Sequence, residues 1–118
     1  IRDLHRVGRY VEAMQQFVAA EGAEADLARK VIFGYLSYGL NRVGADEVVR
    51  SARDVDRIMG FGFNWAPPTV LVDVIGLKET IKQLERYELP VPKVLKDAKP
   101  GEPLFQEPHV NRGRVFAA

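Results

Sequence analysis

The chain has 118 residues, of which 47% are hydrophobic; 17 lysines and arginines stand against 16 aspartates and glutamates, and there is no cysteine. This length suits one domain with its own core, is short for a complete dinucleotide-dependent oxidoreductase and, without cysteine, excludes a disulfide-stabilised scaffold. The net charge of +1 gives no electrostatic reason to expect nucleic acid or an anionic membrane as a partner.

The first 21 residues have the pattern of one amphipathic helix. Its apolar positions are Leu4, Val7, Val11, Met14 and Val18. A spacing of three and four residues puts these side chains on one face, and Gly22 suits the end of the helix. We expect this face to pack against the core. The alternative is that it forms a surface for a partner or a second copy.

A second helical pattern covers residues 25–42, and its apolar sector is wide enough for burial on more than one side. The main face consists of Leu27, Val31, Tyr35 and Tyr38, and Ile32, Leu36 and Leu40 widen it. Gly34 and Gly39 each weaken this helix by about 1 kcal/mol relative to alanine, unless a neighbouring helix approaches closely there.

A third helix is predicted over residues 45–59, with its end at Gly60. The pair Ser51 and Asp54 has the spacing of a capping box, so this helix can break at Ser51. The following stretch, residues 60–68, crowds glycines, aromatic residues and two prolines into a turn.

The rest of the chain is punctuated by proline. Pro68 can be the first residue of a helix that runs to Gly76, and a further helix follows over residues 77–87. That helix turns Leu77, Ile81 and Leu84 inward. A short helix is predicted over residues 92–98, and residues 99–118 are expected to be mostly irregular. Because no strand alternation is present, the fold class is all-α, with five or six helices in a domain of residues 1–98.

No pattern in this chain points to an active site of its own. Gly60-Phe61-Gly62 begins like a dinucleotide fingerprint, but Trp65 occupies the third glycine position and the motif follows a helix instead of a strand. His5 and His109 have no second ligand or catalytic partner at the usual spacing, so no metal site is expected.

Two carboxylates are expected to have structural roles. Asp56 is expected to pair with a basic neighbour or to cap a chain end. Asp73 lies in an apolar helix, where a buried carboxylate needs hydrogen bonds. We expect it to tie down the preceding loop.

From Asp54 to Leu77 the chain resembles the C-terminal helical domain of 3-hydroxyacyl-CoA dehydrogenases, and the similarity covers about residues 27–98. The matching residues, in order, are Val55-Asp56, Met59, Gly60, Gly62-Phe63, Pro67 and Asp73-Val74-Ile75-Gly76-Leu77. The candidate site residues, structural or cleft-lining, are Asp56, Met59, Gly60, Gly62, Phe63, Trp65, Pro67, Asp73 and Gly76. Pro68 and Thr69 depart from the family pattern, which has Phe and Glu there.

The resemblance implies a fold like the C-terminal domain of 6-phosphogluconate dehydrogenase. It also implies a parent enzyme of fatty-acid β-oxidation that uses NAD to oxidise (S)-3-hydroxyacyl-CoA to 3-oxoacyl-CoA. In that family the NAD site and the catalytic His–Glu pair lie in a preceding Rossmann domain. The helical domain closes the acyl-CoA cleft and commonly forms a homodimer. The chain alone is therefore expected to bind no cofactor and to be inactive.

The family usually begins this domain with Gly-Phe-x-x-Asn-Arg, whose Asn approaches the substrate. The corresponding position lies near Val31, where there is no Asn. The chain therefore looks more like the second helical copy of longer fused members, some of which continue into an enoyl-CoA hydratase domain. In such a copy the motif preserves packing and not substrate contact.

The chain begins at Ile1 without an initiator methionine or a signal-peptide pattern, and no apolar run is long enough to span a membrane. We therefore interpret it as a piece of a larger protein, with the cytoplasm as the default location. A second hypothesis, from a different functional class, is a non-catalytic helical module that binds a partner or itself through the stripe from Leu4 to Val18.

Overall fold

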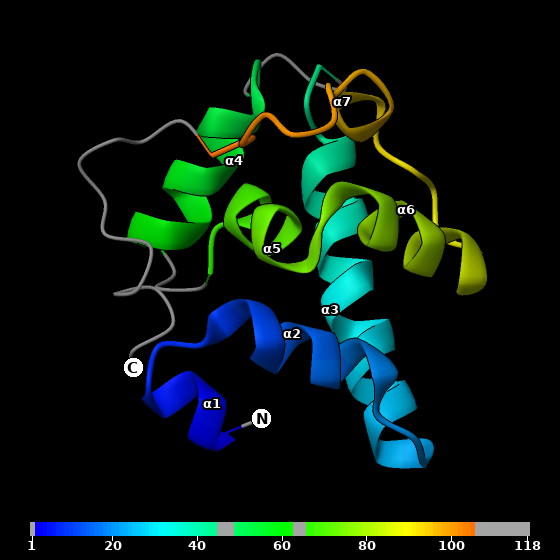
Figure 1. Cartoon of the computed structure of the whole chain (residues 1–118). Helices are drawn as coiled ribbons and strands as arrows, with labels where there is room; N and C mark the ends of the chain where they lie inside the picture. Colours follow the sequence, from blue (N-terminus) through cyan, green and yellow to red (C-terminus); the bar gives the residue numbers. More distant parts are fainter. Residues whose placement is uncertain (1, 45–48, 63–65, 106–118) are drawn as a thin grey trace.

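In the computed structural model, which describes residues 2–44, 49–62 and 66–105, every regular element is a helix (Figure 1). The elements are α1 (Arg2–Arg6), α2 (Tyr10–Ala19), α3 (Ala23–Asn41), α4 (Ala52–Arg57), the π-helical turn η1 (Ile58–Gly62), α5 (Pro68–Ile75), α6 (Leu77–Arg86) and α7 (Lys93–Lys96). The prediction of an all-α chain is confirmed over these residues. The longest helix, α3, runs through the molecule, with α2 across one end and α5 and α6 against its middle.

The predicted single helix over residues 1–21 is wrong, because the chain breaks at Gly8. Gly8 has a left-handed φ of 83°, and the Arg9 N–H donates to the Leu4 carbonyl at 2.8 Å, as at a helix C-terminus. The break changes which residues face inward: Val7 is 68% and Val11 is 52% exposed, whereas Ala13 is fully buried. Of the predicted stripe, Met14 and Val18 pack against the core.

Helix α3 lies where residues 25–42 predict it, but it turns a different face inward. Leu27, Val31 and Tyr38, three residues of the expected main face, are exposed. The buried apolar residues are Phe33, Leu36 and Leu40. Both sides of this helix are apolar, so periodicity alone cannot choose between them. The packing of α5 and α6 makes the choice.

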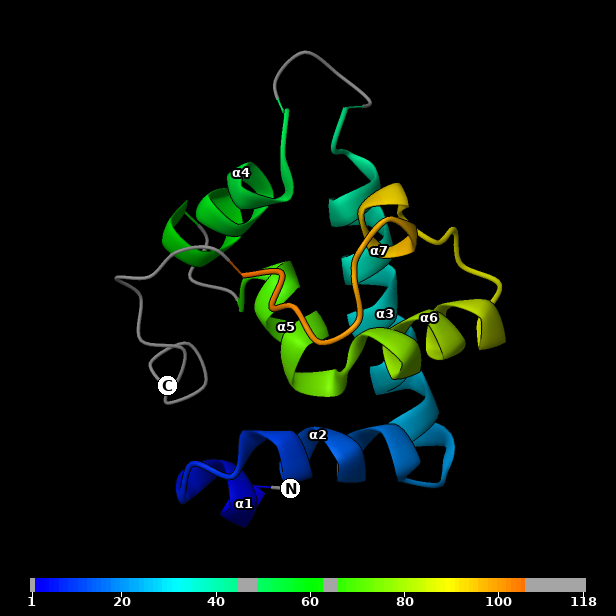
Figure 2. The ribbon, with the colours of Figure 1, turned by 45° about the horizontal axis from the view of Figure 1, so that its top comes forward.

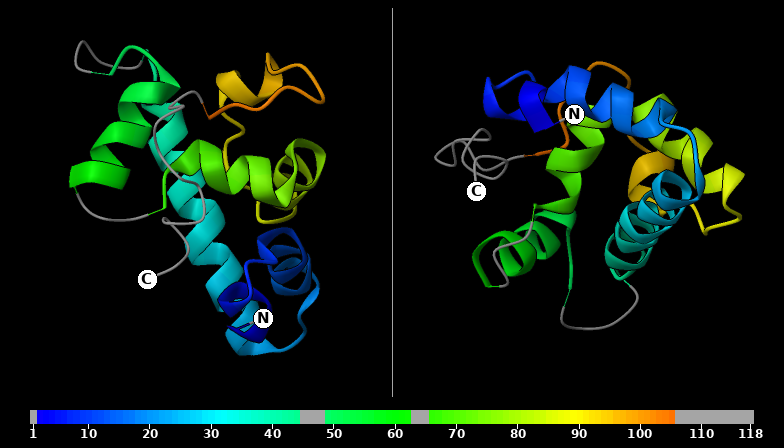
Figure 3. Two further views of the ribbon diagram at one scale, coloured as in Figure 1. Left: turned by 60° about the vertical axis from the view of Figure 1, so that its left-hand side comes forward. Right: turned by 90° about the horizontal axis from the view of Figure 1, so that it is seen from below.

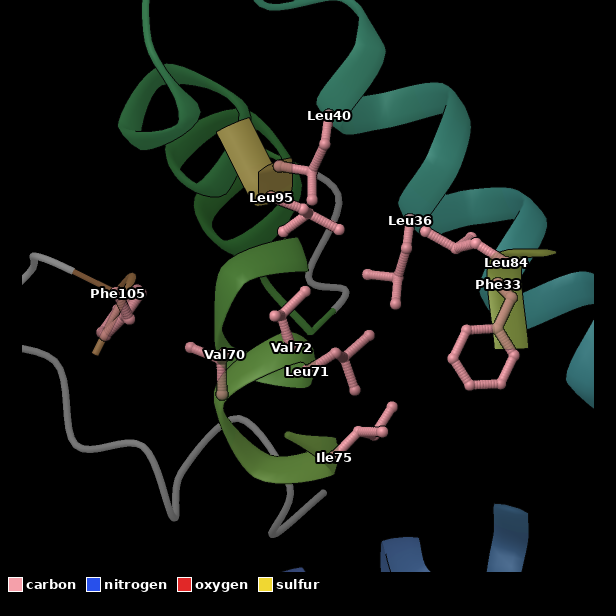
Figure 4. Packing of buried hydrophobic residues seen from close by; sticks show 10 residues of the cluster. All are labelled: Phe33, Leu36, Leu40, Val70, Leu71, Val72, Ile75, Leu84, Leu95 and Phe105. Carbon is pink, nitrogen blue, oxygen red and sulfur yellow. The ribbon is translucent and has the colours of Figure 1, made fainter. Parts of the chain in front are cut away.

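The core is built mainly between α3 and α5, and Figure 4 shows its buried side chains. They are Phe33, Leu36 and Leu40 of α3, Val70, Leu71, Val72 and Ile75 of α5, Leu84 of α6, Leu95 of α7, and Phe105. Helix α5 is buried around most of its circumference. It is therefore the element on which the other helices converge.

The possible break at Ser51 is present, so the predicted helix over residues 45–59 is wrong at residues 49–51, and α4 begins at Ala52. Ser51 is the N-cap of α4, and the Asp54 carboxylate accepts the Ser51 N–H at 3.3 Å, completing a capping box. The part of the predicted helix at residues 45–48 lies outside the described residues. Its predicted end at Gly60 is wrong, because η1 carries the helical path on to Gly62.

The predictions for the following helices are confirmed within about a turn. Pro68 is the first residue of α5 and Leu84 is a buried residue of α6, whose Leu77 and Ile81 also pack against the core. Helix α7 is shorter than the helix predicted over residues 92–98. The segment after it (orange in Figure 2) returns across α5 without regular structure as far as residue 105. In the part of the chain that is described, no helix has both the length and the apolar character of a membrane span.

Candidate functional site

The corner between α4 and α5 brings several of the expected site residues together, and Asp56 is at its centre. Asp56 is only 2% exposed. One carboxylate oxygen accepts the Thr69 backbone N–H at 3.0 Å, and the other accepts the Thr69 hydroxyl. Because Thr69 is the second residue of α5, Asp56 caps the start of that helix. The expectation that Asp56 caps a chain end is confirmed.

Tyr35 connects α3 to this corner. Its hydroxyl donates to the Ala66 carbonyl, just before α5, at 2.7 Å. Burial, and next the negative charge of Asp56, raise the pKa of Tyr35 above its ordinary range, so the phenol remains a donor. Sequence reasoning placed Tyr35 in an apolar face and noted Thr69 only as a departure from a family pattern. The sequence signal that could have pointed to Thr69 is that a buried Asp56 carboxylate needs hydrogen-bond donors.

Gly60 and Pro67 close the corner. A Cβ at Gly60 would lie 2.9 Å from Cγ of Pro67, so the proline ring can pack against the backbone of residue 60 only because that residue has no side chain. Met59 is half-buried in η1, and Gly62 ends that turn. Phe63 and Trp65, also expected here, lie outside the described residues. With no strand before it and Pro67 against it, the Gly60-x-Gly62 turn does not fit a pyrophosphate.

Asp73 lies further along α5 and holds a different segment from the one expected. Its carboxylate accepts the backbone N–H groups of Leu104 at 2.8 Å and Phe105 at 3.0 Å. Asp73 therefore ties down the C-terminal segment. Phe105, whose N–H is one of these two donors, is buried in the core.

Gly76 forms the joint between α5 and α6. Its φ of 104° ends α5, and its carbonyl accepts the Thr80 N–H at 2.9 Å and the Thr80 hydroxyl at 2.8 Å. A cavity of about 270 Å³ lies beside it. The cavity is lined by Val72, Asp73, Gly76, Leu77, Lys99, Gly101, Glu102, Pro103 and Leu104. Asp73, which contributes to this lining, accepts the backbone N–H groups of Leu104 and Phe105.

A second polar cluster, which the sequence did not reveal, surrounds Arg29. This arginine is 3% exposed; its Nε donates to the Tyr87 hydroxyl at 2.8 Å, and one terminal nitrogen donates to the carbonyls of Phe17, at 3.2 Å, and Ala20. Those carbonyls belong to the C-terminal end of α2, where intrahelical donors are lacking. Arg29 therefore joins the end of α2 to α3 and to Tyr87 after α6.

Asp26 completes this cluster at the protein surface. It accepts the Tyr87 hydroxyl at 2.7 Å, and Lys30 lies 3.2 Å from its other oxygen. The hydrogen bond from Tyr87, and next the contact with Lys30, lower the pKa of Asp26. A cavity of about 390 Å³ adjoins the cluster. Of the charged residues beside it, Arg29 joins α2 to α3, and Asp26 and Lys30 pair within α3.

Across residues 2–44, 49–62 and 66–105, no three acidic or histidine side chains converge as ligands for a metal ion. His5 lies in α1, and His109 falls outside these ranges. The expected site residues thus form two structural joints on α5: one around Asp56, Gly60 and Pro67, and one around Asp73 and Gly76.

No protein-family model, curated protein or solved structure matches this chain. A functional assignment therefore rests on the residues and contacts described above.

Proposed function

We propose that this chain is a helical, non-catalytic domain of an NAD-dependent 3-hydroxyacyl-CoA dehydrogenase, and that it shapes the acyl-CoA cleft of the parent enzyme. The observation that carries the proposal is the corner around Asp56. Residues from the string that resembles this family meet in one packed joint between α4 and α5. That string therefore coincides with a structural unit instead of being scattered over the molecule.

The contacts of this joint favour a supporting role over a catalytic one. Both carboxylate oxygens of Asp56 accept hydrogen bonds from Thr69, and the Tyr35 hydroxyl donates to a backbone carbonyl. A general acid or base must instead reach the proton of a substrate. In the proposed parent enzyme, NAD and the catalytic His–Glu pair belong to a Rossmann domain of the same protein.

Two measurements on the chain test this proposal. Calorimetry is expected to show no binding of free NAD, whose site lies in the Rossmann domain. Weak binding of acetoacetyl-CoA would place this domain at the acyl-CoA cleft, whereas no binding would leave it a packing role, as in the second helical copy. Mixed with NAD and (S)-3-hydroxybutyryl-CoA, the chain is expected to produce no NADH. Turnover would contradict the non-catalytic assignment, and an absence of heat with acetoacetyl-CoA would contradict the role in the cleft.

A helical interaction module is the second candidate, and one observation favours it. Leu27, Val31 and Tyr38 on α3 are exposed and large. In this candidate they form the interaction surface that the sequence predicts at the stripe from Leu4 to Val18. Gly8 divides that stripe between two helices. An acyl-CoA result that is negative, together with self-association, would favour this candidate.

A further inference from the structure

The cavity of about 390 Å³ beside Arg29 lies where three helices meet. Its wall combines the end of α2, the connection from α2 to α3, the first two turns of α3 and Arg86 at the end of α6. The right-hand view of Figure 3 shows these segments on the same side of the molecule. A volume of roughly 15 Å³ already admits one water molecule, so this cavity has room for a group of several atoms.

Arg29 presents one edge of its guanidinium group to this cavity. Its Nε donates to the Tyr87 hydroxyl, and its Nη1 donates to the carbonyls of Phe17 and Ala20. Its Nη2 donates no hydrogen bond to the residues that the structure describes, and Oδ1 of Asp26 is 3.9 Å away, beyond hydrogen-bond distance. Among those residues no fully buried side-chain nitrogen or oxygen lacks a partner, so Nη2 is open to the cavity that Arg29 lines.

The burial of Arg29 makes this free edge favourable for an anion. Only 3% of the residue is exposed, and a guanidinium group keeps its charge at any ordinary pH. A buried charge is costly unless hydrogen bonds satisfy it, and the Nη2 donors are the part that the protein leaves unsatisfied. The bonds at Nε and Nη1 fix the orientation of the group, so an anion that binds Nη2 need not order it first.

Arg86 places a second guanidinium group beside the same cavity. Its central carbon lies 5.2 Å from the centroid of the Tyr87 ring, and the hydroxyl of that tyrosine accepts Nε of Arg29. One tyrosine therefore holds both cations. Nη1 of Arg86 makes one long contact, 3.4 Å, with the Gln83 side chain, which leaves most of its five donors available.

The start of α3 adds backbone donors to these two arginines. Gly22 lines the cavity and is the N-cap of α3, and it has no side chain that could accept the N–H groups of the first turn. Helix α3 has 19 residues, so the positive end of a long helix meets the free edge of Arg29 at this cavity.

Two carboxylates, of Glu21 and Asp26, also line the cavity and oppose an anion. The charge of Asp26 is compensated, because this residue accepts the Tyr87 hydroxyl and lies 3.2 Å from the Lys30 ammonium group. Glu21 is exposed in the connection between α2 and α3, where its side chain can turn to solvent. We therefore expect Glu21 to weaken anion binding without preventing it.

We propose that this cavity binds a terminal phosphate group through Nη2 of Arg29, the guanidinium group of Arg86 and the N–H groups at the start of α3. Donors from three directions suit the three free oxygens of such a group better than the two oxygens of a carboxylate. The diphosphate of free NAD has two free oxygens on each phosphorus and provides no such group. A dissociation constant on the order of 1 mM is expected, because the site remains open to water.

A titration with sodium phosphate, followed by NMR of the whole isotope-labelled chain, tests the site. Phosphate replaces sodium chloride at constant ionic strength, so general screening does not change. The Nε–H signal of Arg29 and the amide signals of Gly22 and Ala23 are expected to shift and to saturate. The Arg29 signal is a suitable probe because this N–H is hydrogen-bonded inside the protein. Acetate is expected to bind severalfold more weakly than phosphate.

Charge variants on the cavity wall are compared with the same changes elsewhere. Arg86→Gln is expected to raise the dissociation constant for phosphate about fivefold, and Glu21→Gln is expected to lower it about twofold. Lys82→Gln and Glu102→Gln are the matched controls, because both residues are exposed and lie outside this cavity. Neither control is expected to change phosphate binding. Circular dichroism would verify that all four variants keep the helical content of the parent chain.

Shifts that rise without saturation up to about 50 mM phosphate would overturn the inference. So would equal losses in Arg86→Gln and Lys82→Gln, which would show attraction to the general surface charge, or equal binding of acetate and phosphate. Arg29 stays unchanged in these variants, because it also holds the end of α2. The inference rests on this cavity and not on the proposed function. Inorganic phosphate has no acyl group, so its failure to bind leaves the calorimetry with acetoacetyl-CoA as a separate result.

Discussion

At the scale of single residues, Asp56 shows how one carboxylate can organise a corner. It is buried, and its two oxygens take the N–H and the hydroxyl of Thr69, so its charge is compensated by donors at the start of α5. The chain needs this arrangement because the first turn of a helix has backbone donors without intrahelical acceptors. Pro67 and Pro68, which carry no N–H, leave Thr69 as the first donor there.

We expect Asp56→Ala to lower the free energy of unfolding by about 2–3 kcal/mol, because it removes a cap and leaves buried donors on Thr69. Urea denaturation measures this change. Asp54→Ala is the matched control, since Asp54 caps the less buried start of α4; a loss of about 1 kcal/mol is expected there. Equal losses in the two variants would show that burial of Asp56 contributes nothing.

The stability of the fold is expected to depend on pH through Asp26. The hydrogen bond from Tyr87 and the contact with Lys30 hold its pKa below the ordinary 3.8. A carboxyl whose pKa is lower in the folded state stabilises the fold above its unfolded pKa, and this contribution is lost as the pH falls through the folded pKa. In urea denaturation at a series of pH values, the parent chain should therefore lose more stability below pH 3.8 than Asp26→Asn. Parallel curves for the two proteins would contradict this assignment.

At the scale of elements, glycines have different roles in different helices. Gly8 ends α1, and Gly60 admits the ring of Pro67. Gly39 of α3 faces α4 and α5, since a Cβ there would lie 3.5 Å from Cγ1 of Val55 and 3.8 Å from Cγ of Pro68. Gly34, one turn and a half earlier, faces open space. A glycine is expected to weaken α3 unless a neighbouring helix approaches closely there. Within the chain, neighbouring helices approach at Gly39 and not at Gly34.

The same substitution at two glycines should consequently have opposite effects on stability. Gly34→Ala is expected to raise the free energy of unfolding by about 1 kcal/mol, because alanine restricts the unfolded chain and favours helix. Gly60→Ala is expected to lower it by about 1–3 kcal/mol, because the new methyl group meets Pro67. Urea denaturation measures both changes in the free energy of unfolding. Stabilisation by Gly60→Ala would show that the corner is less closely packed.

At the scale of the whole molecule, Arg29 and Asp73 each form a polar attachment between segments that are distant in sequence. Arg29 holds the end of α2 and Tyr87, and Asp73 holds the backbone at Leu104 and Phe105. Each attachment satisfies backbone or hydroxyl groups that would otherwise be left without partners near the core. They place α2 and the C-terminal segment against the central pair α3 and α5.

Replacing Arg29 should loosen the assembly of α2 on α3. We expect Arg29→Met to lower the free energy of unfolding by about 3 kcal/mol, since the carbonyls of Phe17 and Ala20 lose their donor. Arg9→Met is the control: Arg9 forms an exposed ion pair with Glu12, and a change below about 0.5 kcal/mol is expected. Hydrogen exchange should show faster opening of α2 in Arg29→Met only. Uniform exchange rates in the two variants would contradict a local role for Arg29.

Local signals in the sequence predict most of the helical segments and where several of them begin. The capping pair Ser51 and Asp54, the position of Pro68 and the periodicity of residues 77–87 are local signals, because a helix closes its hydrogen bonds over four residues. The same locality explains the failure at Gly8. A single glycine with a left-handed φ interrupts an apolar pattern that remains regular on both sides of it.

Which face of a helix turns inward, and which polar groups meet, depends instead on how the helices pack together. Two sides of α3 are apolar, and contacts with α5 and α6 select the side with Phe33 and leave Val31 exposed. The partners of Arg29 and Asp73 lie as far away as Tyr87 and Phe105 in the sequence. Such contacts depend on how the helices pack together, and a periodicity of 3.6 residues carries no information about them.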